Sequence, residues 1–207
     1  MNLWSDPSAR IAIRGLNGFR AAAPSLNTAD VPRRPATEAS IGKAISAVAI
    51  SPASSDVVWV GHENGAVFVS RDANGTAPTW LPCPLSPARY CTSVAPHPTD
   101  PATAYATFGG FVNNNVWVTT DFGHTWNALG KQLPAAPVRT LAIHPAKAGF
   151  LYVGTDVGVF ASEDGGATWT PTNQGPANVS VEHLFWSGKV LYAATHGRGM
   201  YRIDLAG

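Results

Sequence analysis

The sequence has few charged residues and no marked excess of either sign. Only 13% of its 207 residues are Asp, Glu, Lys or Arg, against a usual level of about 25%. Fourteen basic and 13 acidic residues leave a formal net charge of +1. Proteins that bind nucleic acid or an anionic membrane carry a basic surface, so this balance predicts no nucleic acid partner and no membrane surface.

Long hydrophobic runs are also missing. No apolar stretch approaches the roughly 18 residues or more that span a membrane, so we expect no membrane span. The N-terminus, MNLWSDPSARIAIRGL, lacks the basic, apolar and small-residue order of a secretory signal. A signal removed earlier, or carried on a longer parent protein, leaves the compartment open.

Turn-forming residues are abundant instead, with 20 glycines and 17 prolines, and 45% of the chain is hydrophobic. This composition excludes a coiled coil, a charged disordered tail and a bundle of long helices. A chain of this length is sufficient for one domain whose core buries roughly 70% of the surface of the unfolded chain.

The chain is built from internal repeats. Similar segments begin at Ile45, Thr92 and Val138, with a shorter one at Ser180. Pro52, Pro98 and Pro145 mark a period of 46 and then 47 residues. This period is typical of propeller blades and kelch repeats.

Each repeat has the pattern of four short strands. In the third, the predicted strands are Thr140 to Ile143, Phe150 to Gly154, Val159 to Ser162 and Trp169 to Thr172. Runs such as VVWV and FLYVG are apolar at successive positions, which indicates that both faces of each sheet are covered. We therefore predict an all-β propeller of four-stranded antiparallel blades, about four of them in this chain.

A turn of the form Ser/Thr-x-Asp-x-Gly-x-Thr-Trp follows the third strand of three repeats. It occurs as SRDANGTAPTW, with three extra residues, as TTDFGHTW and as SEDGGATW. Asp accepts hydrogen bonds from turn amides, Gly allows positive φ, and Trp covers the apolar side of the hairpin. The Asp and Trp residues of these turns are Asp72, Asp121, Asp164, Trp80, Trp126 and Trp169.

These turns resemble the Asp-box, or bacterial neuraminidase repeat (BNR), of β-propellers in the sialidase, xyloglucanase and sortilin-like groups. The resemblance covers Ile45 to Leu205 and implies that the six Asp and Trp residues are structural. The groups include enzymes, receptors and secreted proteins of uncharacterised activity, so no single activity is implied. A secreted or periplasmic protein is the expectation that accompanies it.

The repeats divide the chain into two parts. Residues 1–44 form an N-terminal segment, and residues 45–207 form blades at approximately 45–91, 92–137, 138–179 and 180–207. Asn2 to Arg14 resembles a strand that closes the ring, and an Ala- and Pro-rich loop follows it. Three assemblies fit: one closed four-bladed ring, two chains in an eight-bladed ring, or the C-terminal half of a larger propeller. We favour a half-propeller that either pairs with a second copy or belongs to a larger whole.

An antiparallel meander places the hairpins between second and third strands at one end, together with the connections between blades. We predict that this end binds a protein or glycan ligand without catalysis. The predicted contacts are His62, Asn113, Asn114, His196 and Arg198, with Phe108 or Phe111 as an apolar anchor. Asn suits sugar hydroxyls because its amide both donates and accepts hydrogen bonds. Solvated turn residues are the alternative interpretation.

A glycoside hydrolase is the second hypothesis. Such an enzyme needs two carboxyl groups roughly 5 to 9 Å apart. Glu63 and Asp156 are the acidic residues of the four hairpins, so they are the candidate acid and base. The arginine cluster and the tyrosine nucleophile of a sialidase are not found in this pattern.

The two cysteines, Cys83 and Cys91, lie eight positions apart in a Pro-rich connection. They form either a disulfide that closes this loop or a pair of small buried residues. The sequence has no Cys-x-x-Cys or His-Glu-x-x-His string, so we predict no metal site and no cofactor.

Overall fold

The computed structural model describes residues 43–85, 87–172 and 175–203, which form four antiparallel sheets in chain order. We call the sheets blades 1 to 4. Blade 1 holds β1 (Ile45–Ser51), β2 (Ser54–His62), β3 (Val67–Ser70) and β4 (Leu81–Cys83). Blade 2 holds β5 (Cys91–Pro96), β6 (Ala104–Phe108), β7 (Val116–Thr119) and β8 (Asn127–Ala128). Blade 3 holds β9 (Val138–Ile143), β10 (Leu151–Thr155), β11 (Gly158–Ser162) and β12 (Thr170–Pro171). Blade 4 holds β13 (Val181–Ser187), β14 (Val190–Thr195) and β15 (Met200–Ile203).

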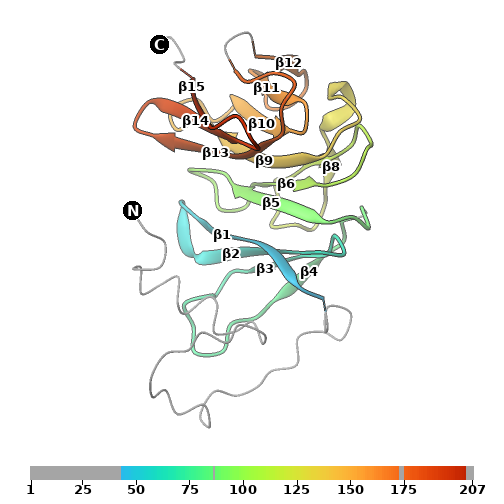
Figure 1. Ribbon diagram of the computed structural model, residues 1–207. Coiled ribbons are helices and arrows are strands. Elements are labelled where there is room, and N and C mark those ends of the chain that lie inside the picture. The colour runs from blue at the N-terminus through green and yellow to red at the C-terminus, as the bar shows by residue number, and fades with distance from the viewer. Residues whose placement is uncertain (1–42, 86, 173–174, 204–207) are drawn as a thin grey trace, which may run out of the picture.

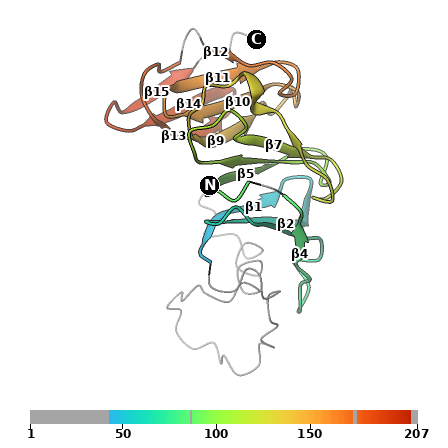
Figure 2. The ribbon, with the colours of Figure 1, turned by 90° about the vertical axis from the view of Figure 1, so that its right-hand side faces the viewer.

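The blades are stacked face to face, with blades 1 and 4 at opposite ends of the stack (Figures 1 and 2). Their first strands are neighbours, since β1 contacts β5, β5 contacts β9, and β9 contacts β13. The predicted all-β propeller architecture is confirmed, and a short 3₁₀ helix, η4 (Gly130–Gln132), links blades 2 and 3. The predicted ring-closing strand, Asn2 to Arg14, lies outside the described residues.

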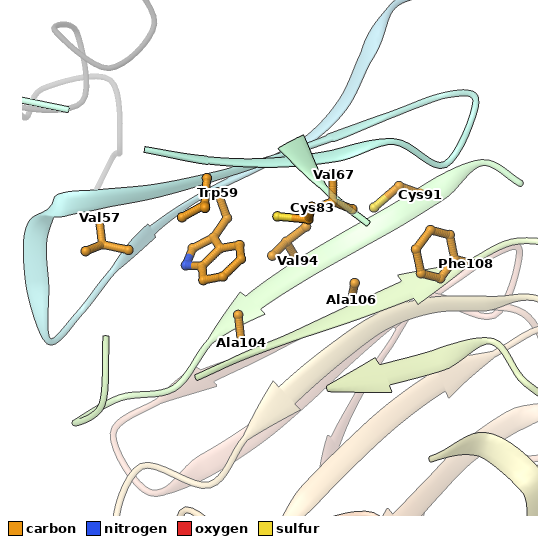
Figure 3. Packing of buried hydrophobic residues seen from close by; sticks show 10 residues of the cluster. Val57, Trp59, Val67, Cys83, Cys91, Val94, Ala104, Ala106 and Phe108 are labelled. Atoms are coloured by element: carbon orange, nitrogen blue, oxygen red, sulfur yellow. The ribbon is translucent and has the colours of Figure 1, made fainter. Parts of the chain in front are cut away.

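The hydrophobic core lies between successive blades. Figure 3 shows the layer between blades 1 and 2, where Trp59 of β2 faces Val94 of β5 and Ala104 of β6. Trp59 is fully buried and packs edge-on against Trp126, with ring centroids 6.1 Å apart. Blades 2 and 3 are covered by a neighbouring blade on either side, which explains strands with apolar side chains on both faces.

The three Asp turns, Ser70–Trp80, Thr119–Trp126 and Ser162–Trp169, have a common hydrogen-bond pattern. In the third, Ser162 Oγ donates to Asp164 Oδ1 at 2.8 Å, and the Thr168 amide donates to the same oxygen at 2.9 Å. In the first, the Thr79 amide donates to Asp72 at 2.7 Å, so the three extra residues leave this bond intact. Gly166 adopts a φ of 94°, a conformation that favours glycine.

We expect the Asp turns to make the folded protein sensitive to acid only at low pH. Hydrogen bonds from Thr125 and Thr168 lower the pKa of Asp121 and of Asp164 to about 2. The unfolded chain titrates at about 3.9. Because the folded pKa lies below the unfolded pKa, the two carboxylates stabilise the fold above about pH 4, and this contribution is lost as the pH falls toward 2.

The measurement is urea unfolding between pH 2 and 7. The loss of stability below pH 4 is expected to be shallower in the Asp121→Asn/Asp164→Asn variant than in the wild type. Glu163→Gln is the matched control, since Glu163 is exposed and lies in the same turn as Asp164. An unchanged pH profile in the double variant would contradict the assignment.

Cys83 and Cys91 are both free thiols, so of the two alternatives the structure has the unbonded one. Each fills space beside a glycine. A Cβ atom at Gly61 would lie 2.3 Å from Cys91 Sγ, and one at Gly123 would lie 2.4 Å from Cys83 Sγ. The alternative interpretation, two small buried residues, describes their role in the layer of Figure 3.

Neither thiol is expected to react in the folded protein. Burial raises the pKa of both Cys83 and Cys91 to about 12, and the thiolate is the reactive form. Titration with Ellman's reagent at pH 8 is expected to detect no thiol in the native protein and two per chain in 6 M guanidinium chloride. A native chain that reacts within minutes would show that the layer between blades 1 and 2 opens easily.

Candidate functional site

The hairpins between second and third strands lie at one end of the blades, together with the connections between blades. One backbone hydrogen bond recurs in all four blades and ties the start of each hairpin to the residue that precedes the first strand. These bonds are Glu63 N to Ala44 O, Gly109 N to Tyr90 O, Asp156 N to Pro137 O, and His196 N to Ser180 O, at 2.9 to 3.2 Å. We call this side the hairpin end. The Asp turns lie at the opposite end, where for example Gly165 N donates to Gly149 O.

A β-bulge recurs near the start of the first strand of every blade. The register shifts there by one residue, and the residues left out of the pairing are Ser46, Thr92, Arg139 and Glu182. A bulge redirects the side chain of the extra residue. Ser46 Oγ donates to Cys91 O of the next blade at 2.6 Å, and Thr92 Oγ1 donates to Val138 O of the blade after it.

Arg139 and Glu182, the last two bulge residues, belong to a charged cluster with Asp156 and Ser180. Arg139 Nε donates to Asp156 Oδ1 at 2.7 Å, and Arg139 Nη1 lies 3.7 Å from Glu182 Oε2. Ser180 Oγ lies 2.9 Å from Asp156 Oδ1 and 2.7 Å from Glu182 Oε1. We call these four residues the Arg139 cluster. It holds one cation and two anions at the junction of blades 3 and 4.

The Arg139 cluster lines an open hollow of about 630 Å³, and His196 forms the rest of the lining. A second hollow of about 270 Å³ runs along the first strands of all four blades. Arg139 and Glu182 line both, so the charged cluster lies where the two meet.

The charges of the cluster stabilise one another. Partial burial acts to raise the pKa of Asp156, but hydrogen bonds from Arg139 and Ser180 outweigh it and lower the pKa. The same bond to Asp156 raises the pKa of Arg139. Asp156 is therefore an anion at neutral pH, which suits an electrostatic contact and does not suit a general acid.

The structure brings only some of the predicted contacts together. Asp156 and His196 line the larger hollow, whereas Glu63, the other predicted catalytic residue, lines neither hollow. His62 is buried, with Nδ1 3.2 Å from Lys43 O and its ring edge-on to Phe68. His62 therefore packs within blade 1, which leaves little of its surface for the predicted ligand contact. Arg198 lies in the same hairpin as His196 and is exposed.

The hairpin from Gly109 to Asn115 presents one of the two predicted aromatic anchors. Phe111 is 78% exposed, whereas Phe108 is fully buried between blades 1 and 2, so Phe108 is excluded as an anchor. Asn113 is exposed. The amide oxygen of Asn114 accepts a hydrogen bond from Arg89 at 3.0 Å, which leaves it less available to a ligand.

Sequence reasoning missed several residues that build this end. Arg139, Ser180 and Glu182 were missed because they lie in or before first strands, outside the hairpins. Asn115 is buried, and its Nδ2 lies 2.6 to 3.0 Å from the carbonyl oxygens of Gly110, Val112 and Ala136. The three successive Asn residues of this hairpin were a signal, but the sequence does not show which one turns inward.

Exposed apolar side chains gather at the hairpin end. Of the eight large hydrophobic residues that are exposed in the described part of the chain, five lie there: Tyr90, Phe111, Val112, Val157 and Met200. Val157 lies in the same hairpin as Asp156.

Among the described residues, no three His, Cys, Asp or Glu side chains come close enough to hold a metal ion. The same residues contain no helix with the length and hydrophobicity needed to cross a membrane.

No protein-family model matches the chain. A xyloglucanase of Hypocrea jecorina is 43% identical over 53 residues, which is 26% of this chain and 6% of that enzyme. This chain therefore spans a small part of the length of that relative.

Several solved structures are similar to this chain in fold. A GH74 enzyme of Niastella koreensis aligns with a TM-score of 0.61 at 17% identity, over 77% of this chain and 28% of the enzyme. YCF48 bound to a D1 peptide aligns with a TM-score of 0.55 at 18% identity, over 78% of this chain and 51% of YCF48. The computationally designed protein Ika4 aligns with a TM-score of 0.59 at 12% identity, over 80% of this chain and 93% of Ika4. The chain is thus similar to GH74 xyloglucanase and YCF48 propellers in fold.

Proposed function

We propose that this chain is a non-catalytic binding module that holds a segment of another protein at its hairpin end. The observation that carries the proposal is that most of the exposed large apolar side chains of the described residues lie at the same end as a charged hollow. Exposed apolar patches of soluble proteins commonly mark interaction sites. The similarity in fold to YCF48, whose structure holds a D1 peptide, supports a peptide ligand.

The ligand we infer is an extended segment with a basic residue between apolar ones. The Arg139 cluster has one more anion than cations, and the Glu182 side chain is 43% exposed, so the hollow suits a Lys or Arg side chain. Val157 and Met200, at 42% and 62% exposure, offer apolar contacts at the same end of the blades.

The three Asp turns contribute indirectly. We infer that they are Asp boxes of the BNR type, as their residues and shared hydrogen bonds suggest. They lie in blades 1 to 3 at the end away from the ligand, where they connect the third and fourth strands. Secretion and the division of the chain at residue 44 remain predictions from sequence.

The test is selection of peptides from a displayed random library on the wild-type protein. The selected peptides are expected to bind the Tyr90→Ser/Phe111→Ser variant at least ~10-fold more weakly, which corresponds to about 1.4 kcal/mol. Glu182→Gln is expected to weaken only peptides that contain Lys or Arg. Leu81→Ser, an exposed site on β4 away from this end, is the matched control and is expected to change binding less than 2-fold.

A glycan ligand is the other outcome of this experiment. If the peptide library gives no binder and a glycan array gives one, the ligand of the hairpin end is a glycan and not a peptide.

A glycoside hydrolase is favoured by one observation, the 53-residue match to a xyloglucanase. The lowered pKa of Asp156 suits the ionised member of the carboxyl pair and not the general acid, and Glu63, the other candidate, lines neither hollow. We expect no release of reducing sugar from xyloglucan. Release that disappears in Asp156→Asn or Glu63→Gln would establish the enzyme instead.

A further inference from the structure

Blades 1, 2 and 3 each press one face against the next blade in the chain, which we call the forward face. One position on it recurs in the second strand of every blade, as Trp59, Tyr105, Tyr152 and Tyr192, each paired with the equivalent position of the first strand. The first three are 0%, 6% and 5% exposed. Tyr192, on blade 4, is only half-buried, because blade 4 is the last blade of the stack (Figure 1).

The forward face of blade 4 carries a row of stacked rings. His183 and Phe185 have ring centroids 5.9 Å apart, and Phe185 and Tyr192 have theirs 5.4 Å apart with an interplanar angle of 13°. His183 is exposed and Phe185 is 37% exposed. In blades 1, 2 and 3 the equivalent position is occupied by Ala49, Ala95 and Ala142. Blade 4 thus presents more apolar surface at this position than the blades that are covered.

The opposite, backward face of each blade receives the forward face of the blade before it. Its recurring position in the first strand is Val48, Val94, Leu141 and Leu184. The last three are 7%, 5% and 4% exposed, whereas Val48, on blade 1, is 46% exposed. Farther out on the same face, Val58 and Val60 are buried with Ala73.

We propose that the forward face of blade 4 docks on the backward face of blade 1 in a second copy of this chain. The forward face of blade 4 and the exposed Val48 of blade 1 occupy the positions that form the two halves of an interface three times within the chain. A second copy supplies both halves at once, so a two-fold axis uses this contact twice and closes a ring of eight blades. Phe185 and Tyr192 then pack near Val48 of the second copy.

The bulge residues support the same arrangement. Ser46, Thr92 and Arg139 each interact with the first strand of the following blade. Glu182 is the last of the series, and in the ring it lies beside β1 of the second copy. The hollow along the first strands then becomes a channel enclosed by both chains, with an Arg139 cluster at each of two opposite positions on its rim.

The first test is the mass in solution, by size-exclusion chromatography with light scattering. We expect twice the chain mass of 21.7 kDa for the wild type, and the chain mass itself for Phe185→Asp and for Val48→Asp. Phe111→Asp is the matched control, since Phe111 is more exposed but lies on neither face, and it is expected to remain a dimer. Both test positions are exposed within one chain, so circular dichroism should show folded variants. A wild type that is monomeric at 100 μM would overturn the proposal.

The second test is cross-linking, which identifies the faces. A Val48→Cys chain is mixed with a Phe185→Cys chain under mild oxidation, and a disulfide-linked pair of the two is expected. Each variant alone is expected to give none, because the contact joins two different faces. The native thiols are buried and do not compete. Cross-linking of Phe185→Cys with itself would show that blade 4 packs on blade 4, and would refute the arrangement.

Discussion

Replacement of Trp59 by Ala is expected to lower the free energy of unfolding by about 3–5 kcal/mol, the usual cost of removing a large buried aromatic side chain. Trp59 is fully buried in the layer between blades 1 and 2 and contacts the ring of Trp126. The cavity cannot close easily, because both walls are sheets fixed by their own hydrogen bonds. A loss of this size is a large fraction of the stability of a typical domain.

The Trp59→Phe variant separates packing from hydrogen bonding. The indole Nε1 of Trp59 is buried without a hydrogen-bond partner, so Phe removes volume but no hydrogen bond. We expect Trp59→Phe to lose clearly less stability than Trp59→Ala in urea unfolding followed by circular dichroism. Equal losses in the two variants would show that the layer depends on the indole ring as a whole and not on the filled volume.

Replacement of Asn115 by Ala is expected to cost roughly 2–5 kcal/mol, since each buried carbonyl left without a partner costs about 1–3 kcal/mol. The side-chain amide of Asn115 bonds the hairpin to itself through Gly110 O and Val112 O, and to the link between blades 2 and 3 through Ala136 O. Asn115→Asp is expected to be worse, because it directs a buried negative charge at the same oxygens.

Asn113→Ala is the matched control, as Asn113 lies two positions away in the same hairpin and is exposed. Its stability is expected to stay within about 0.5 kcal/mol of the wild type. Peptide binding should fall in Asn115→Ala, since the hairpin that carries Phe111 loses its internal support. Unchanged stability and binding would show that this hairpin holds its shape by backbone bonds alone.

The fold was predictable because its signals are local and repeated. A fixed period, apolar runs such as VVWV and three turns in register each describe one blade, and stacking follows from the need to cover both faces. The predicted second strand, Phe150 to Gly154, differs from β10 (Leu151–Thr155) by one residue at each end.

The candidate site was only partly predictable, because it depends on which way single side chains turn. Asp156 and His196 lie in hairpins, where exposure is the usual state, and they line the hollow. Arg139 and Glu182 are exposed only because a bulge takes them out of the ladder, and one extra residue does not show in a strand that is apolar on both faces. Phe108 and His62 end strands instead of beginning loops, which explains their burial.

The recurring bulge has a consequence for how this scaffold can vary. Ser46, Thr92, Arg139 and Glu182 differ in size, polarity and charge, yet the pairing on either side of them is the same in every blade. One residue per blade is thus uncoupled from the register of its sheet. Mutational drift at these four sites can change what the rim recognises without a change of strand register, and a library randomised there should yield new binders on the same strand pairing.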